Sequence, residues 1–267
     1  MMNLRKILLL YSLLMIFSFA FSQGEFSLTR EPDNYNVNIF AVKLNTNGFG
    51  LDYNFQMRKH YRLRRVIDVE YNYLIDIKNI KLVNEQFQTF NKKTFVFGKL
   101  YSAHNINLGY GYNRMFFEKR DNNSVSIHLY GTCGFSFCFL KPIYYQKFNI
   151  NTMLVDYEKF DINSPNGNYD IIGRAPFYLG LNEMKIVPGI YAKIAVDFDF
   201  AKDIMRTSIL SVGVELNAYI KKIEIMAENA RYFIPQLYIM YSFGKKYDSK
   251  LNREFRKEMR KQERKNK

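Results

Sequence analysis

The chain has 267 residues, with no tryptophan, two cysteines and three histidines. Three scattered histidines and two cysteines make a poor ligand set for a metal ion, and we expect no metal and no cofactor. Cys133 and Cys138 are five residues apart in one apparent strand, which places them on opposite faces and about 17 Å apart. Because a disulfide needs Cα atoms within about 7 Å, both cysteines are expected to stay free and to fill space as small apolar residues.

After its first segment the chain also lacks long apolar runs. Two basic residues precede the apolar stretch 7–21, and the small residues Ala20 and Ser22 stand at −3 and −1 of a cleavage site before Gln23. This is the pattern of a secretory signal peptide. The stretch is shorter than the roughly 20 residues that a spanning helix needs. We expect a cleaved signal over residues 1–22 and no transmembrane helix in the mature chain.

Positive charge is concentrated at the end of the chain. The formal net charge is +14, and residues 245–267 carry eleven Lys/Arg against four Asp/Glu, which is half of that net charge. The rest of the chain is only mildly basic, so nucleic acid is not an expected partner. In this tail, Leu251, Phe255 and Met259 recur every four residues, which predicts an amphipathic helix. It is either a periplasmic arm that docks a protein, the cell wall or anionic lipid, or a solvated helix.

Apolar and polar residues alternate with a period of two in eight runs, which predicts eight β-strands. The expected strands are residues 34–44, 49–58, 64–76, 105–118, 124–140, 185–200, 207–220 and 232–243. In the first strand, Val37, Ile39 and Ala41 are assigned to the apolar face. Several runs exceed the usual strand length of about 5–6 residues and reach the roughly 9–11 residues of a membrane strand.

Alternation alone fits both a soluble β domain with an apolar core and a membrane barrel with an apolar exterior. Export, strand length and an aromatic content of 17% favour the membrane barrel. The links after even-numbered strands are short. Among the links after odd-numbered strands, 77–104 and 146–184 are long and 221–231 is intermediate, an asymmetry expected of outer-membrane barrels.

Two loop segments leave alternatives open. Thr94–Tyr101 also alternates, so it is either a loop segment at the barrel mouth or a short strand that, with a partner, would make ten strands; eight is preferred. The apolar segment 177–181 either folds into the mouth as a plug or lies in solvent.

The signal, the amphipathic strands and a last strand, 234–243, that ends on Phe243 resemble the small, porin-like outer-membrane β-barrel proteins of Gram-negative bacteria. The resemblance implies an all-β, antiparallel, up-and-down transmembrane barrel over residues 23–244. It also implies contact with outer-membrane lipid and insertion by the barrel-assembly machinery, which reads the terminal aromatic residue. We expect a non-enzymatic structural, accessory or narrow-channel role.

Charged residues on the polar strand faces are candidates to line the lumen. They are Asp52, Arg58, Arg64, Asp68, Glu70, Arg114, His128, Lys193, Asp197, Asp199 and Glu215. They form either a charged channel lining or a network of paired charges that fills a narrow interior. Eight strands enclose a space just wide enough for side chains, and the mixed signs favour pairing.

Two residue pairs are candidates for enzymatic chemistry. Ser126 and His128 are about 7 Å apart along one strand face, whereas a nucleophile and its base need contact within about 3 Å. Asp197 and Asp199 share a face, but Lys193 beside them favours a salt-bridged lining. An outer-membrane lipid-modifying enzyme would place a tight catalytic constellation at the outer rim. That enzyme and a soluble periplasmic lipid-binding barrel remain the alternatives.

Overall fold

The computed structural model describes residues 35–60, 62–76, 79–83, 94–119, 124–149, 152–161, 170–201, 206–227 and 229–248. The expected signal peptide and the tail residues Leu251, Phe255 and Met259 lie outside the described residues. The expected tail began at residue 245, but Lys245 to Asp248 belong to the last strand. Within the described part of the chain, no helix is long and apolar enough to cross a bilayer.

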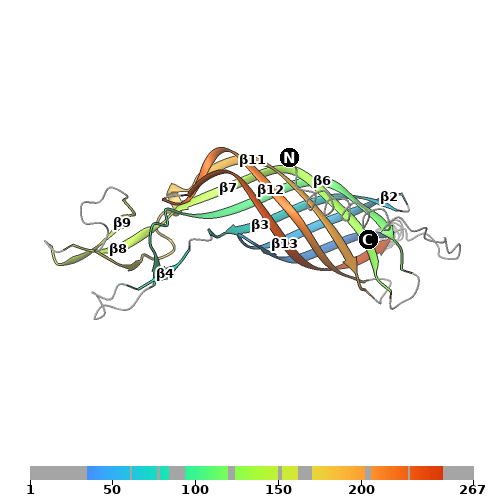
Figure 1. The fold of residues 1–267 in the computed structure, drawn as a ribbon, viewed down its shortest axis with the longest axis horizontal. Helices are drawn as coiled ribbons and strands as arrows, with labels where there is room; N and C mark the ends of the chain where they lie inside the picture. Colours follow the sequence, from blue (N-terminus) through green and yellow to red (C-terminus); the bar gives the residue numbers. More distant parts are fainter. Residues whose placement is uncertain are drawn as a thin grey trace, which may run out of the picture. The chain divides into compact units, whose positions relative to one another are not determined.

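Eight antiparallel strands close into a barrel in which each strand pairs with its neighbours in sequence and the first pairs with the last (Figure 1). They are β1 (Tyr35–Asn45), β2 (Gly48–His60), β3 (Leu63–Leu74), β6 (Tyr101–Phe117), β7 (Ser126–Pro142), β11 (Lys185–Asp199), β12 (Arg206–Met226) and β13 (Asn229–Asp248). The prediction of an eight-stranded up-and-down barrel is confirmed.

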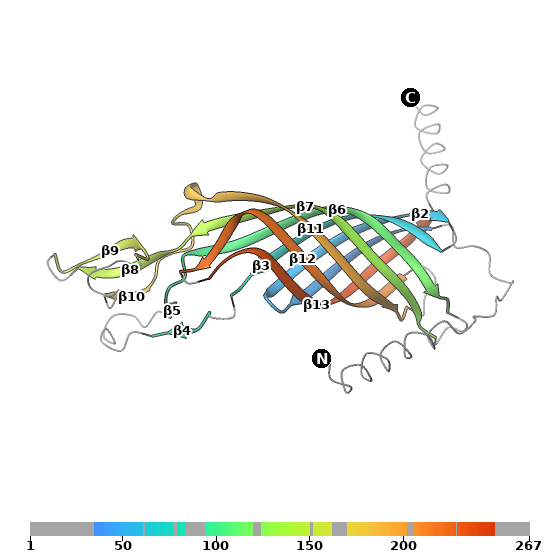
Figure 2. The same cartoon turned by 45° about the horizontal axis from the view of Figure 1, so that its top comes forward.

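The barrel closes where β1 meets β13. Tyr35 lies opposite Asp248, Phe40 lies opposite Phe243, and the two phenyl rings are 5.4 Å apart. The start of β1 and the end of β13 therefore share one end of the barrel, here called the termini rim. The opposite end is called the loop rim, because both long connections, between β3 and β6 and between β7 and β11, leave from it (Figure 2).

The other two connections at the loop rim are tight. The β1–β2 turn requires glycine at Gly48, whose φ is +138° and whose added Cβ would lie 1.9 Å from the carbonyl oxygen of Tyr73. The intermediate link expected over residues 221–231 is wrong. Both β12 and β13 continue through it, because Ile223, Ile225 and Met226 pack into the apolar interior at this end.

The long β7–β11 connection carries a second sheet. The strands β8 (Tyr144–Asn149), β9 (Leu154–Lys159) and β10 (Ile171–Arg174) pair in the order β10-β8-β9, and a 3-10 helix, η2 (Leu181–Glu183), follows them. β8 begins two residues after β7 ends (Figure 2). This β7–β11 connection is here called the extension, and its residues Ile143, Tyr145 and Ile171 form a buried cluster with Phe95 of β5.

The two ambiguous segments are resolved. Thr94–Tyr101 is not an additional barrel strand: it contains β5 (Phe95–Val96), which pairs with β4 (Lys81–Leu82), and Tyr101 begins β6. Phe177 and Tyr178 are 57% and 69% exposed, so the 177–181 segment does not fill the mouth.

The barrel strands alternate between a buried inward face and an exposed outward face. On β1 the predicted assignment of faces is reversed. Val37, Ile39 and Ala41 are buried in the lumen, whereas Phe40 and Val42 point outward. Both faces of this strand are apolar, so alternation alone did not distinguish them.

Candidate functional site

The centre of the lumen holds a lysine surrounded by carboxylates. The ammonium Nζ of Lys193, on β11, lies 2.7 Å from Asp52 Oδ2, 2.9 Å from Asp68 Oδ2 and 2.7 Å from Glu70 Oε2. The side chains of all four residues are fully buried. Alternation places them there, because each occupies an inward position of its strand. Breaking such a buried pair from one side costs about 3–5 kcal/mol, because it leaves uncompensated charge.

A second lysine, missed from the sequence, extends this network across the barrel. Lys43 of β1 is fully buried and forms ion pairs with Glu70 and Glu215. It lies two residues after Ala41, on the face of β1 that the alternation predicts to be apolar and in contact with lipid. A charge flanked by Val42 and Leu44 was the available signal that this face is the interior.

Neutral polar groups satisfy the remaining carboxylate oxygens. The hydroxyls of Tyr130 and Tyr191 each lie 2.9 Å from an Asp68 oxygen. The amides of Asn107 and Asn217 donate to Glu215 Oε1 over 3.0 and 2.7 Å. The interior is therefore a connected polar network, in which lost hydration is replaced by direct contacts.

Asp52, Asp68 and Glu70 each offer a carboxylate oxygen, and these oxygens lie within 4.8 Å of one another, close enough to hold a metal ion. The ammonium of Lys193 already contacts all three carboxylates. The lysine thus supplies the positive charge that a metal would otherwise bring.

Nearer the termini rim, hydrogen bonds connect four side chains in series. Asn113 donates through Nδ2 to Asp197 Oδ2 over 2.9 Å, and its Oδ1 lies 3.0 Å from His128 Nδ1. Because an amide oxygen only accepts, Nδ1 carries the proton and Nε2 accepts from Ser126 Oγ at 3.1 Å. The expectation that Ser126 and His128 are too far apart is wrong. Their backbones are separated, but the two side chains lean toward each other along the face.

The interior at the loop rim is apolar. Ten buried residues pack there: Leu74, Ala103, Cys138, Leu140, Val187, Tyr219, Ile223, Ile225, Met226 and Ile234. The segment Gly98–Leu100 is hydrogen-bonded to the end of β12, from Leu100 N to Ile225 O at 3.0 Å and from Ala227 N to Gly98 O at 2.9 Å. This apolar layer fills the loop-rim end of the lumen, and the segment Gly98–Leu100, here called the strap, is bridged to the end of β12 at Lys99 and Met226.

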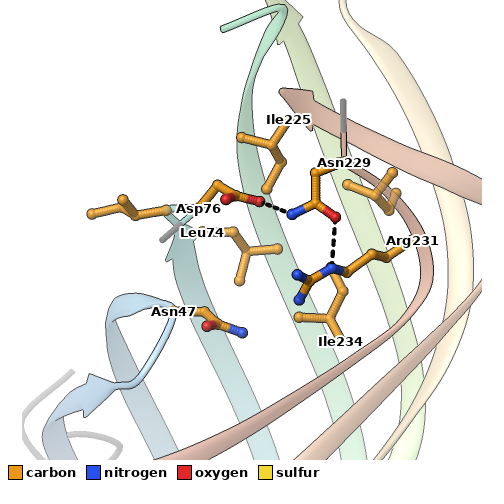
Figure 3. Close-up of a pocket in the computed structure, with 9 residues that line it drawn as sticks. Asn47, Leu74, Asp76, Ile225, Asn229, Arg231 and Ile234 are labelled. Carbon is orange, nitrogen blue, oxygen red and sulfur yellow. Dashed lines mark hydrogen bonds between the residues drawn. The ribbon is translucent and has the colours of Figure 1, made fainter. Parts of the chain in front are cut away.

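A small cavity lies beside this layer, between the β1–β2 turn and the β12–β13 hairpin (Figure 3). Asn229 crosses it, donating to Asp76 Oδ2 over 2.6 Å and accepting from Arg231 Nε over 2.8 Å. The cavity has a volume of about 30 Å³, which is enough for a water molecule. It is too small for an organic ligand.

The remaining predicted lumen residues lie toward the termini rim. Asp199 is buried and contacts Lys119 Nζ at 3.4 Å. Arg58 and Arg64 are half-buried and lie opposite each other in register on β2 and β3. The assignment of Arg114 to the lumen is wrong. Arg114 has the parity of the outward-facing Tyr112, is exposed, and has its guanidinium carbon 5.5 Å from the centroid of the Phe116 ring.

The outer wall is apolar along its middle and basic at its end. Its exposed residues include Leu51, Ile67, Leu108, Leu129, Phe135, Ile190, Ile194, Val212, Val214, Leu237 and Ile239. Four exposed basic residues, Lys59, Arg65, Arg114 and Lys245, mark the termini rim of this wall. An apolar exterior around a lumen of paired charges is the inside-out polarity of a membrane β-barrel. The chain is a small β-barrel of the outer-membrane type.

The fold is similar to several solved barrels at low sequence identity. Neisserial surface protein A is 10% identical, with a TM-score of 0.40 over 80% of this chain and 96% of that one. The N-terminal barrel domain of Pseudomonas aeruginosa OprF is 5% identical, with a TM-score of 0.36 over 81% and 100%. The attachment invasion locus protein Ail of Yersinia pestis is 7% identical, with a TM-score of 0.36 over 80% and 99%. No protein-family model and no curated protein matches the chain.

Proposed function

We propose that the protein is a non-enzymatic outer-membrane barrel with a closed lumen, which serves as a scaffold for the sheet β10-β8-β9. The observation that carries the proposal is the filling of the interior. The ion pairs of Lys43 and Lys193 occupy its centre, and ten apolar residues with the Gly98–Leu100 strap occupy its loop-rim end. A barrel closed in this way acts through its exposed parts, so the extension and the outer wall are the working surfaces.

The test is conductance across a planar bilayer. The refolded protein is expected to give no current steps above the bare bilayer at voltages at which a general porin, reconstituted in the same way, conducts. Steady ion-selective steps from the purified protein would contradict the closed lumen and would favour the narrow-channel alternative.

The extension is proposed to face the outside of the cell and the termini rim the periplasm. Short turns at one end and long connections at the other support this orientation. The basic residues 249–267 would then hang in the periplasm, where we propose that Leu251, Phe255 and Met259 dock a protein, the cell wall or an anionic surface. A chain truncated after Asp248 keeps all of β13. It should lose the periplasmic material that co-purifies with the full chain; recovery of the same material would contradict docking.

A hydrolase is the second candidate, favoured by the Ser126–His128–Asn113 hydrogen bonds. The geometry resembles a nucleophile, a base and an orienting group. Against it, Ser126 is only 5% exposed inside the lumen. The neighbouring backbone amides are already hydrogen-bonded within the β-sheet, so they are not free to stabilise an oxyanion. A fluorophosphonate probe should leave the folded protein unlabelled. If the probe labels the wild type and Ser126→Ala abolishes the labelling, the hydrolase becomes the better interpretation.

A further inference from the structure

Three basic residues come together at the loop rim, one from β7, one from the Gly98–Leu100 strap and one from β10. Lys141, near the end of β7, lies opposite Ser102 of β6 in register. Lys99 belongs to the strap, and its Nζ lies 5.8 Å from the centroid of the Tyr73 ring. Arg174 ends β10. These three residues are called the rim cluster, and none of them takes part in the lumen network.

Buried contacts hold the rim cluster in place. The hydroxyl of Tyr145 lies 2.7 Å from the carbonyl oxygens of both Val96 and Lys99, which fixes the strap to β8. Arg174 lies opposite Tyr145 in register, so β8 positions it as well. The Nζ of Lys141 lies 4.2 Å from the centroid of the Phe177 ring, which covers it.

Polar groups that can bind an anion line the same place. Ser102 Oγ is 3.4 Å from both the Tyr73 hydroxyl and His104 Nε2. The positive charges of Lys99 and Lys141 both act on His104. The charges of Lys99 and Arg174 both act on Tyr73. Lys99 and Lys141 therefore lie beside one polar patch made by β3 and β6, and Arg174 is near enough to act on it.

Among the residues that the structure describes, this positive charge is not matched by a paired carboxylate. Lys141 is 2% exposed and Lys99 is 6% exposed. Within the described ranges of the chain, no carboxylate forms an ion pair with Lys99, Lys141 or Arg174, whereas Lys43 and Lys193 are each paired with two or more. Buried cations without a partner are costly, and an anion bound among them would offset that cost.

We propose that Lys99, Lys141 and Arg174, with Ser102 and Tyr73, form a binding site for a phosphate group. Two ammonium groups and a guanidinium supply the charge, and two hydroxyls supply directed donors. Phosphate binding commonly uses this combination, because the anion offers several strong acceptor oxygens.

The phosphate is that of a lipid headgroup. Tyr71, Tyr73 and His104 form the loop-rim end of the apolar wall, with the Tyr71 hydroxyl 2.7 Å from His104 Nδ1. Amphipathic rings of this kind mark the level of the headgroups, and basic pockets at that level bind them. This assignment of the source rests on the outer-membrane barrel proposed above. The phosphate chemistry itself does not.

The test compares lipid-borne with free phosphate on the intact barrel. Native mass spectrometry measures retention of phosphatidic acid against phosphatidylcholine by the detergent-solubilised protein. Thermal unfolding measures the effect of inorganic phosphate against sodium chloride of equal ionic strength. The variants are Lys141→Gln/Arg174→Gln, the charge-preserving Lys141→Arg, and the control Lys222→Gln, an exposed lysine of β12 outside the rim cluster. Heat-modifiable gel migration, recorded for each, shows whether the barrel has folded.

The wild type is expected to retain phosphatidic acid about tenfold more than phosphatidylcholine. The double variant should lose this preference, and Lys141→Arg and Lys222→Gln should keep it within about twofold. Stabilisation by inorganic phosphate without lipid preference would uphold the phosphate site and overturn the lipid source. Equal retention by a folded double variant would overturn the site. A wild type that shows no heat-modifiable migration would instead count against the proposed function, so the two failures are distinguishable.

Discussion

Lys193 is the residue on which the closed interior depends most directly. Its single ammonium contacts three carboxylates on the neighbouring strands β2 and β3. Lys43 also pairs with Glu70, so loss of Lys193 leaves Asp52 and Asp68 without an ion pair among the described residues. Coulomb repulsion between buried like charges falls off slowly where no water screens it. The lysine is therefore needed for stability whether or not the barrel conducts.

Replacing Lys193 with methionine should lower the free energy of unfolding by about 3–5 kcal/mol, because it leaves unpaired buried charge. Urea unfolding of the protein refolded into vesicles, followed by tyrosine fluorescence, measures the loss. The control is Lys222→Met, which removes an exposed lysine and should change stability by less than about 1 kcal/mol. Equal stabilities for both variants would show that the lumen ion pairs are dispensable.

Individual residues also show where sequence reasoning reached its limit. Asp52, Asp68, Glu70, Lys193 and Glu215 were placed inside because each follows the alternation of a strand with one clearly apolar face, and the structure brings them together. Ion-pair partners could not be predicted, since they join strands whose relative stagger is set by the closed ring. Arg114 lies on the outward face of β6, which is apolar at the preceding outward positions, because the outer wall becomes basic at the termini rim.

At the scale of the element, β7 and β9 offer a direct comparison. Phe135 of β7 is 67% exposed and Leu154 of β9 is 64% exposed, so bare solvent accessibility does not distinguish them. In a membrane barrel, however, Phe135 faces hydrocarbon and Leu154 faces water.

Phe135→Arg should therefore destabilise the vesicle-inserted protein by about 2–4 kcal/mol, the cost of an arginine near the bilayer midplane. Leu154→Arg, its matched control, should be nearly neutral. Urea unfolding in vesicles measures both. If the two substitutions are equally harmless, the apolar wall does not face lipid and the soluble barrel becomes the better account.

The extension depends on one buried phenol. Burial raises the pKa of the Tyr145 hydroxyl, whose proton is shared between two carbonyl oxygens. A folded pKa above the unfolded value, near 10, means that this residue contributes stability below about pH 10 and loses it as pH rises through the folded pKa. Limited proteolysis of the strap should accelerate above pH 10 in the wild type. Tyr145→Phe should be cleaved faster at neutral pH, with a smaller further rise. Identical pH profiles would remove Tyr145 from this role.

Elements were predictable to different degrees for a physical reason. Barrel strands have one face in lipid, so their alternation is strong, and their bounds differed from the expected ones by a few residues in most cases. β8, β9 and β10 have no such constraint. For example, β9 (Leu154–Lys159) is exposed or half-exposed along its whole length. Its sequence therefore predicts only part of the long connection 146–184.

For the whole molecule, orientation is the property that the proposal needs most. In a background with Cys133 and Cys138 replaced by alanine, Leu154→Cys should react with a membrane-impermeant maleimide on intact cells. Lys59→Cys, at the termini rim, should react only after the outer membrane is permeabilised. Labelling in the opposite order would place the extension in the periplasm and overturn the proposed scaffold role.

The seam between β1 and β13 has a consequence for biogenesis. Phe40 meets Phe243 across it, so the first strand waits for nearly the entire polypeptide before its open hydrogen-bonding edge is covered. Contacts so remote in sequence make a β protein slow to fold, and the incompletely folded chain is prone to aggregate. A chain that ends before β13, which begins at Asn229, leaves the edge of β1 uncovered, so its barrel cannot close. The full chain is therefore exposed to aggregation until β13 has paired with β1.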